Sequence, residues 1–348
     1  MSNSINTKLK KVLVIGLGQL GLPVAKYVND KGFDVYGYDI NSESMLRAQE
    51  KIGIKTTTSF RNFDIYIICI STHNPSDISS PQIEGLLSVI NKISREANNG
   101  SLVSIESTIP PGTSQKVFEL LEHRLHVVHA PHRWYSQDED KHGVNQLRVI
   151  GGVNPCCLKL GSEFYTGHSK CVTQIYNDEE IANQYNGQEE ANRSLNVSPA
   201  NFVEKSLANN NNHNNNNQIN SQAYSQSLEI PMHTVLTIEI AELTKIIENS
   251  HRYLQIAFAE ELYLYCQTNR VNFTELRDAL NTKWNVEILE PRRGIGGHCL
   301  PKDTKMFLNS SKFKSKILHS AMEVDSLYRD SMSIREKKLI TSVENLTN

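Results

Sequence analysis

A glycine-rich turn near the N-terminus constrains the fold of this chain more than any other feature. An apolar run, Val12 to Ile15, leads into the sequence GLGQLG at residues 16–21, and a helical pattern, Pro23 to Val28, follows. In this context three glycines permit a tight turn, let a pyrophosphate approach the backbone at the helix N-terminus, and let helix and strand pack closely. The turn predicts a dinucleotide site formed by Gly16, Gly18, Gln19, Leu20 and Gly21.

Asp39 ends the next apolar run and is the acidic partner that such a turn requires. Its carboxylate is placed to accept hydrogen bonds from a ribose diol and to repel a 2'-phosphate, which favours NAD over NADP as the cofactor. A tight strand-to-helix turn without a ligand is the alternative, and the strand-turn-helix context makes it the less favoured one.

Short apolar runs alternate with helical patterns through the first 150 residues. This alternation predicts an α/β fold with a doubly wound parallel sheet, and we assign residues 1–153 to an NAD-binding Rossmann domain. The expected strands are Val12–Ile15, Val35–Tyr38, Ile65–Ile70, Leu102–Ile105, Val127–Val128 and Val149–Ile150.

The second half of the chain changes composition twice. A connecting segment, 154–183, leads to an asparagine-rich stretch, 184–227, which we interpret as a disordered insertion because it offers little apolar surface to bury. Residues 228–335 are predicted to form an α-helical domain on a long helix, Ile238–Cys266, and 336–348 a tail. The residues expected to bury a continuous face of that helix are Ile240, Leu243, Ile247, Leu254, Ala257, Phe258 and Leu262.

Composition excludes several classes of function. The 36 Lys and Arg residues nearly balance the 38 Asp and Glu residues, so the chain has no global field for nucleic acid. No apolar stretch reaches the ~18 residues of a membrane span, because Gly, Pro and Gln19 interrupt Val12–Ala25. The 6 cysteines are irregularly spaced without a CxxC pair, which favours reduced thiols in a cytoplasmic protein.

Cys299 is the candidate nucleophile, within the sequence GIGGHCLPKD at residues 294–303. Its glycines allow a ligand to approach the backbone, and the cations nearby, His298 and Lys302, are expected to lower the pKa of the thiol. The alternative is a buried, inert cysteine, which we prefer for Cys69 and Cys266 in apolar surroundings.

Two further groups of polar residues have a competing structural interpretation. Lys245 and Asn249 share one face of the long helix with Glu242 and could line a cleft, although spacing alone favours a solvated Glu–Lys pair. The histidines at 126, 129 and 132 repeat every third residue, which on a strand places neighbours on opposite faces. We therefore interpret them as polar residues at strand ends and predict no metal.

Four separate blocks of this sequence resemble the UDP-glucose/GDP-mannose dehydrogenase family, and within it most closely the UDP-N-acetylmannosamine dehydrogenase branch. Outside the asparagine-rich stretch the resemblance covers nearly the whole chain, and the GGHC block is more specific than the glycine turn. The blocks are GLGQLGLPVA at 16–25, ESTIPPGT at 106–113, AELTKIIEN at 241–249 and GIGGHCLPKD at 294–303.

The resemblance implies a cytoplasmic, homodimeric, NAD-dependent enzyme that oxidises the C6 alcohol of a nucleotide sugar to a carboxylate for polysaccharide biosynthesis. The sugar would be of the UDP-N-acetylmannosamine or UDP-glucose type. By the same resemblance, Cys299 would capture the aldehyde as a thiohemiacetal and then carry a thioester. Lys245 and Asn249 would stabilise the oxyanion, and Asp303 would act with Lys245 on water and protons. Thr108 would contact the same catalytic water or the cofactor, and Thr72 would lie at the cofactor.

Two departures from the family are expected to matter. His132 stands where the family usually has a glutamate associated with thioester hydrolysis, and a histidine can serve as a general base near neutral pH. The family commonly continues into a third domain that binds the nucleotide of the substrate, whereas this sequence ends at Asn348, soon after the helical segment Ser315–Met332. We therefore expect weaker contacts to that nucleotide.

Two other functions remain open from the sequence. A two-electron β-hydroxyacid-type dehydrogenase also pairs a Rossmann domain with a helical one and uses a lysine, but it gives Cys299 no role. A non-catalytic NAD-binding subunit is the third possibility. The number of NADH molecules formed per product separates all three.

Overall fold

A computed structural model describes residues 9–74, 76–135, 138–167, 226–310 and 312–347 of the chain. Nearly all of the predicted asparagine-rich insertion, 184–227, lies outside these residues, as does 168–183 of the predicted connecting segment. The rest of that connecting segment contains a helix, α6 (Pro155–Thr166). Asn154 caps its N-terminus, where the side chain accepts a hydrogen bond from the Cys157 N–H.

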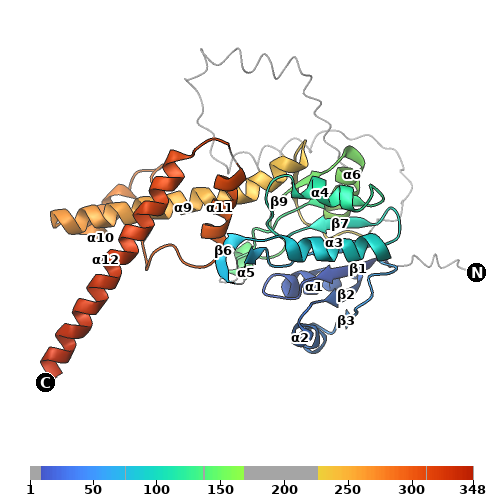
Figure 1. The fold of residues 1–348 in the computed structure, drawn as a ribbon, viewed down its shortest axis with the longest axis horizontal. Helices are drawn as coiled ribbons and strands as arrows, with labels where there is room; N and C mark the ends of the chain where they lie inside the picture. The colour runs from blue at the N-terminus through green and yellow to red at the C-terminus, as the bar shows by residue number, and fades with distance from the viewer. Residues whose placement is uncertain (1–8, 75, 136–137, 168–225, 311, 348) are drawn as a thin grey trace, which may run out of the picture. The chain divides into compact units, whose positions relative to one another are not determined.

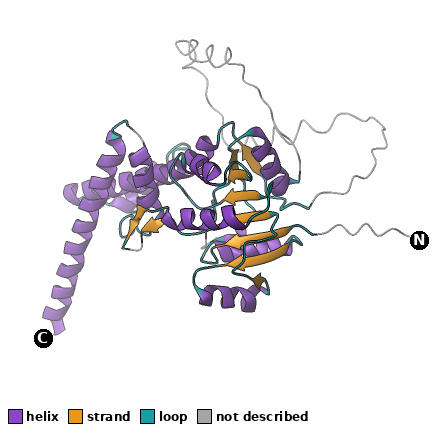
Figure 2. Ribbon diagram, turned by 45° about the vertical axis from the view of Figure 1, so that its right-hand side comes forward, coloured by secondary structure: helices purple, strands orange, loops and turns teal. Residues whose placement is uncertain are grey.

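The centre of the fold is a mostly parallel sheet of 8 strands in the order β10-β9-β8-β7-β4-β1-β2-β3 (Figures 1 and 2). The pairing of β9 with β8 is antiparallel, and β10 pairs parallel to β9, so both β9 and β10 run against the other strands. The order confirms the doubly wound α/β prediction, and all six expected strands are present. The strands are β1 Lys11–Ile15, β2 Asp34–Tyr38, β3 Lys55–Thr56, β4 Ile65–Ile68, β7 Leu102–Ile105, β8 His126–His129, β9 Arg148–Gly152 and β10 Met232–Thr234.

Helices cover both faces of the sheet because successive strand residues point to opposite sides. On one face Val12 and Val14 pack with buried residues of α1 (Gly21–Asp30) and α6. On the other, Leu13 and Ile15 pack with α3 (Glu84–Glu96) and α4 (Thr113–Leu120). The smaller elements are α2 Ser42–Ile52, α5 Glu139–His142, and the antiparallel pair β5 His73–Asn74 and β6 Asp77–Pro81.

Four helices form the C-terminal part, and the predicted long helix is confirmed as α9. Both α11 and α12 contact α9, and α11 also contacts β6. The helix α12 continues as one element past residue 335, where the predicted tail begins. The bounds are α9 Ile238–Asn269, α10 Phe273–Leu280, α11 Cys299–Ser310 and α12 Lys316–Thr347.

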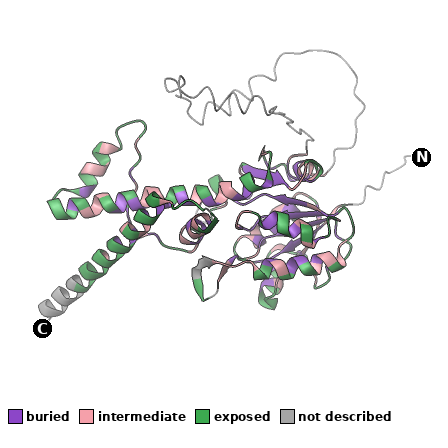
Figure 3. Cartoon of the chain, turned by 45° about the horizontal axis from the view of Figure 1, so that its top comes forward, coloured by how far each residue is buried: buried purple, intermediate pink, exposed green. Residues whose placement is uncertain are grey.

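The buried face of α9 differs from the predicted one. Ile240, Ile247 and Phe258 are 44%, 42% and 57% exposed, although they were expected to be buried. The buried stripe instead includes Ile246 and Tyr253, so exposed and buried residues alternate along the helix in Figure 3. Helical periodicity finds apolar stripes, but it cannot tell which stripe meets the rest of the same chain. In the described part of the chain, no helix is both long enough and apolar enough to cross a bilayer.

Candidate active site

The loops that follow β1, β4, β7 and β8 gather at the carboxyl edge of the sheet, because parallel strands end on the same side. The helices α9 and α11 bring further polar residues to these loops. A hydrogen bond from the Lys302 Nζ on α11 to the Thr72 Oγ1 connects the two parts.

Each glycine of the turn at 16–21 has a different steric environment. Gly16 has a φ of +91°, and a Cβ on it would lie 2.6 Å from the Cys69 carbonyl oxygen. A Cβ on Gly21 would lie 1.7 Å from the Gly16 oxygen, whereas a Cβ on Gly18 would meet nothing within 4 Å. Packing therefore requires Gly16 and Gly21, and Gly18 leaves open space of the kind that a pyrophosphate needs.

Gln19 and Leu20 lead from this turn into α1. Gln19 is exposed and Leu20 is half-buried, and among the described residues no side chain caps the N-terminus of the helix. The first amides of α1 are thus left without a side-chain acceptor, as expected at the anion-binding end of a helix.

Asp39 lies beside the turn and is held by two backbone amides. Its Oδ2 accepts a hydrogen bond of 2.7 Å from the Leu17 N–H, and its Oδ1 accepts one of 2.8 Å from the Asn41 N–H. These bonds fix the carboxylate against the glycine turn while the residue remains half-buried. The turn and Asp39 together fit a dinucleotide.

A chain of hydrogen bonds connects five polar residues of α9, α11 and the strand ends. Asp303 accepts from the Asn249 Nδ2 at 2.5 Å and from the Lys302 Nζ at 2.6 Å. Lys302 also donates to the Thr72 Oγ1 at 3.4 Å, and that hydroxyl donates to the Thr108 carbonyl at 2.6 Å. Four residues expected at the site are therefore brought together, and Asp303 forms an ion pair with Lys302.

Cys299 begins α11 and is accessible to solvent, yet the surrounding protein desolvates its thiol. This desolvation raises the pKa of the thiol, and Asp303 raises it further, whereas Lys302 and Lys245 lower it. The predicted net lowering is wrong, because the effect of burial exceeds that of the cations. The half-buried Lys245 is nevertheless close enough for its charge to act on Cys299.

His132 lies in a buried network around a carboxylate. Its Nε2 bonds to the Glu106 Oε2, which also lies 3.2 Å from the Arg148 Nη1 and accepts from the Cys69 thiol at 3.7 Å. The Tyr165 hydroxyl donates to the other oxygen of Glu106. The prediction that Cys69 lies within a strand differs slightly from the structure, since β4 ends at Ile68.

Burial and the neighbouring charges act on the pKa values of Glu106 and His132. Burial alone would raise the pKa of Glu106, but His132, Arg148 and Tyr165 outweigh it and hold the pKa below its usual range. Burial, together with Arg148, lowers the pKa of His132, and the Lys245 charge adds to this lowering. A neutral His132 that donates from Nε2 keeps its Nδ1 as an acceptor, and no described residue bonds to that Nδ1.

Glu242 has a structural role that spacing did not predict. It is fully buried, and its carboxylate accepts from the Gly112 N–H at 2.6 Å and from the Ser114 N–H at 2.8 Å. It therefore binds the N-terminus of α4 and attaches α9 to the loop after β7. The expectation of a solvated Glu–Lys pair is wrong.

Glu106, Arg148 and Lys302 were not predicted as site residues. Glu106 directly follows an apolar strand, and Lys302 lies within the block around Cys299, so a charged residue next to an apolar or glycine-rich segment was a usable signal. Arg148 offered none, because only the pairing of β9 with β8 brings it to Glu106.

Comparison with known proteins gives matches to two domains of one family. The NAD-binding domain of the UDP-glucose/GDP-mannose dehydrogenase family matches residues 44–169. The central domain of the same family matches residues 239–326. The first match begins after the glycine turn, so the interpretation of that turn depends on its geometry.

Individual relatives extend the similarity to almost the whole chain. A UDP-N-acetyl-D-mannosamine dehydrogenase from Methanococcus vannielii is 26% identical over 95% of this chain and 69% of its own length. The structure of a UDP-D-ManNAc dehydrogenase from Pyrococcus horikoshii, also 26% identical, aligns with a TM-score of 0.66 over 97% of this chain and 72% of that one. A 3-hydroxyisobutyrate dehydrogenase from Mycobacterium tuberculosis, 12% identical, shares the fold alone, with a TM-score of 0.60 over 92% of this chain and 94% of that one.

The glycine turn predicts opposite outcomes for two alanine substitutions. Gly21→Ala places a Cβ against the Gly16 carbonyl and should lower the free energy of unfolding by at least about 3 kcal/mol. Gly18→Ala meets no protein atom, so it should change stability by less than about 0.5 kcal/mol while weakening NAD binding. Urea denaturation and calorimetric titration with NAD measure the two effects. Equal loss of stability in both variants would contradict the assignment.

Two buried histidines predict a loss of stability in acid. Burial lowers the pKa of His129 to about 3 and that of His132 below its usual range, whereas imidazoles in the unfolded chain titrate near ~6.5. Unfolding therefore takes up protons below that pH, so the stabilisation is complete above ~6.5 and declines as the pH falls towards the folded-state values. Each histidine contributes a slope of at most about 1.4 kcal/mol per pH unit.

His129→Leu should remove one of these contributions between pH ~6 and ~5, as measured by urea denaturation at a series of pH values. His233→Gln, at an exposed strand position, is the matched control and should retain the full slope. Glu106 adds its own loss only below about pH 4.3 because its folded-state pKa is lowered. Parallel curves for the wild type and His129→Leu would refute the prediction.

Proposed function

Because the chain belongs to the UDP-glucose/GDP-mannose dehydrogenase family, we propose that it oxidises the C6 alcohol of a UDP-sugar to a carboxylate. It is an NAD-dependent oxidoreductase that acts on a CH–OH donor. UDP-N-acetylmannosamine is the first candidate substrate, since similar relatives are named for it, and UDP-glucose is the second. The observation that carries the proposal is the accessible Cys299 thiol within the electrostatic reach of Lys245, Lys302 and Asp303.

The glycine turn and Asp39 are the residues that would hold the cofactor. Gly18 offers open space for the pyrophosphate, and the uncapped start of α1 offers amides to it. The fixed carboxylate of Asp39 would accept the ribose hydroxyls. When bound, NAD accepts a hydride in each of two oxidations. The Thr72 hydroxyl donates a hydrogen bond to the Thr108 carbonyl, and these two residues would position the end of the cofactor near α11.

Cys299 would divide the four-electron oxidation into two steps. The first oxidation removes a hydride and a proton from the alcohol and leaves an aldehyde. The thiol adds to the aldehyde carbon, and its proton passes to the carbonyl oxygen to give a thiohemiacetal. Removal of a second hydride and the hydroxyl proton gives a thioester, and water then releases the acid and the free thiol. Since the pKa of this thiol is raised, a neighbouring base must relay this proton from the sulfur to the carbonyl oxygen.

Lys245 and Asn249 are placed to serve the oxygen of the reacting carbon. They lie one turn apart on α9, and the charge of Lys245 acts on the Cys299 thiol. The Lys245 charge and the Asn249 amide, which is held by Asp303, would stabilise negative charge as it develops on oxygen. The buried Asp303, ion-paired with Lys302, would orient water and transfer protons beside them.

His132 would act as the base for thioester hydrolysis. Its imidazole is neutral because burial lowers its pKa, and its Nε2 is held by Glu106. That bond leaves the buried Nδ1 without a hydrogen-bond partner among the described residues, so a water that enters the site with the substrate would give its proton there. A carboxylate that orients a histidine in this way is a recurrent arrangement in hydrolysis.

We also propose that the enzyme is a cytoplasmic homodimer that supplies sugar acids for polysaccharide. The exposed apolar residues Ile240, Ile247 and Phe258 on α9 support a second copy packing on this helix. Unpaired thiols at the five described cysteines support a reducing compartment. The polysaccharide role follows from the family alone.

The NADH yield tests the proposal against its rivals. Incubation with NAD and a panel of UDP- and GDP-sugars should give two NADH per sugar acid, with product mass and absorbance both measured. Cys299→Ala should lower acid formation by a factor on the order of 10³, and Cys266→Ala, a cysteine on α9 outside the proposed chemistry, should not. One NADH per product with an active Cys299→Ala would support the two-electron dehydrogenase, and NAD binding without turnover would support the non-catalytic subunit.

Substitution of His132 tests the hydrolytic step separately. His132→Gln should slow acid release and let an acyl-enzyme accumulate, detectable by mass spectrometry after a burst of NADH. His132→Glu should release acid faster than the glutamine variant because it restores a base. The control is the exposed His233→Gln. If both His132 variants match the wild-type rate of acid release, His132 has no part in hydrolysis.

A further inference from the structure

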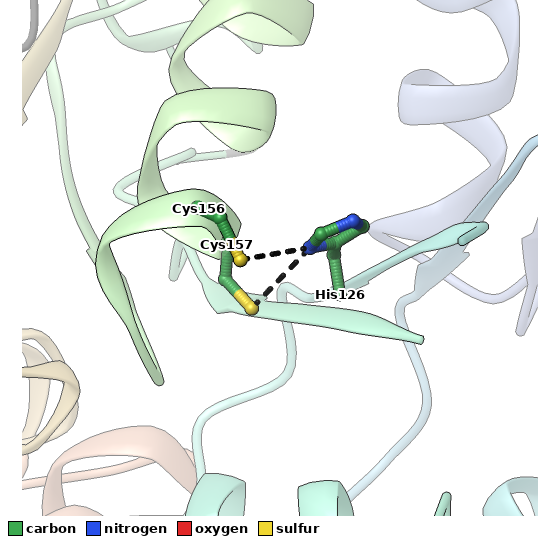
Figure 4. A group of neighbouring side chains, drawn as sticks. All are labelled: His126, Cys156 and Cys157. Carbon is green, nitrogen blue, oxygen red and sulfur yellow. Dashed lines mark hydrogen bonds between the residues drawn. The ribbon is translucent and has the colours of Figure 1, made fainter. Parts of the chain in front are cut away.

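A second cluster of reactive side chains lies away from the proposed active site. His126, Cys156 and Cys157 offer ligand atoms that all lie within 4.8 Å of one another. The His126 Nδ1 is 3.7 Å from the Cys156 Sγ and 3.6 Å from the Cys157 Sγ, so both sulfurs face the same ring nitrogen (Figure 4). None of the three residues has a role in the proposed oxidation.

The antiparallel pairing of β8 and β9 builds this cluster. Val128 pairs with Gly152, and the Val153 N–H donates to the Val127 carbonyl at 3.1 Å, so the end of β9 lies beside the start of β8. The helix α6 begins there and places both cysteines in its first turn, opposite His126. His132 follows the other end of β8. The two sites are therefore at opposite edges of one sheet.

We propose that His126, Cys156 and Cys157 bind a divalent zinc ion. Zinc takes thiolate ligands at ~2.3 Å and imidazole ligands at ~2.0 to 2.1 Å in tetrahedral geometry, which requires sulfur and nitrogen to be about 3.6 Å apart. The two sulfur–nitrogen distances, 3.7 and 3.6 Å, already meet this requirement. The three side chains thus need little rearrangement to hold the ion.

Burial raises the pKa of the Cys157 thiol, so the ion itself must displace the thiol protons, and two features of the surroundings then favour the bound thiolates. The Val127 N–H donates to the Cys157 Sγ at 3.4 Å, and the start of α6 presents the positive end of its dipole to both sulfurs. In the metal-free protein the Cys156 thiol donates a hydrogen bond of 2.9 Å to the Asn154 Oδ1. After that proton is lost, the same oxygen can accept a hydrogen bond from a water on the metal.

Binding is balanced in charge and protons. The ion displaces one proton from each thiol, His126 stays neutral with its proton on Nε2, and the resulting site carries no net charge. A water completes the tetrahedron. Cys156 is exposed and Cys157 is buried, so the ion enters from the solvent and joins β8 to α6.

The cluster of Cys69, Glu106 and His132 also brings three ligand atoms together, but it is a poorer cation site. The Arg148 guanidinium lies 3.2 Å from the Glu106 oxygen that an ion would need, and it repels a second cation. Among the described residues, no lysine or arginine forms an ion pair with a member of the His126 cluster. This difference supplies an internal control.

The test uses Co²⁺ as a spectroscopic probe on the reduced, chelator-treated full chain, followed by displacement with Zn²⁺. We expect one Co²⁺ per chain, with a thiolate-to-cobalt charge-transfer band and the visible bands of a tetrahedral ion. Cys156→Ser and His126→Asn should weaken binding by at least about 100-fold, since even the loss of an indirect partner costs 10 to 100-fold. The matched thiol controls Cys69→Ser and Cys299→Ser should keep the band.

Thermal unfolding gives a second readout that does not depend on turnover. Zn²⁺ should raise the Tm of the wild type and leave that of His126→Asn unchanged, and circular dichroism verifies that the variants fold. Because Cys156 is exposed and His126 half-buried, these two variants suffice even if Cys157→Ser does not fold. Absence of a thiolate band, a band retained in His126→Asn, or a band lost in Cys69→Ser would overturn the proposal.

Discussion

The arrangement of the proposed active site depends on the contacts of one buried carboxylate, that of Glu106. A fully buried charge is tolerated only when partners surround it, and removal of one partner from such a pair typically costs ~3 to 5 kcal/mol. The partners of Glu106 come from β9, from the segment after β8 and from α6. The network that stabilises the sheet therefore also holds His132 in position, while burial is the main cause of its lowered pKa.

The reversed direction of β9 explains why one sheet carries two different sites. Because β9 runs against β8, its first residue, Arg148, lies at the edge where β7 and β8 end and there pairs with Glu106. Its last residue leads into α6 at the opposite edge, beside His126. The polar chemistry of oxidation and the soft ligands of the proposed zinc site are thereby kept apart.

Contacts of the helical part complete the oxidation site. Glu242 accepts hydrogen bonds from the amides that begin α4, and Lys302, whose charge is balanced by the adjacent Asp303, donates to the Thr72 hydroxyl after β4. These are buried, charge-assisted bonds whose partners are distant in sequence, so they hold α9 and α11 against the strand ends more firmly than exposed pairs would. Lys245, Asn249 and Cys299 owe their common location to them.

Local patterns determined the elements of this protein. The apolar runs, the glycine turn, Asp39 and the long helix could all be recognised from neighbouring residues, because strand and helix periods and turn sterics act over a few positions. Only the tertiary structure decided which stripe of α9 is buried, that Asp303 pairs with Lys302, and that the pKa of Cys299 is raised. It also placed Arg148 on Glu106 and His126 on two cysteines. Burial and charge pairing depend on residues that are far apart in sequence, and a pattern of neighbouring residues does not show which of these residues meet in space.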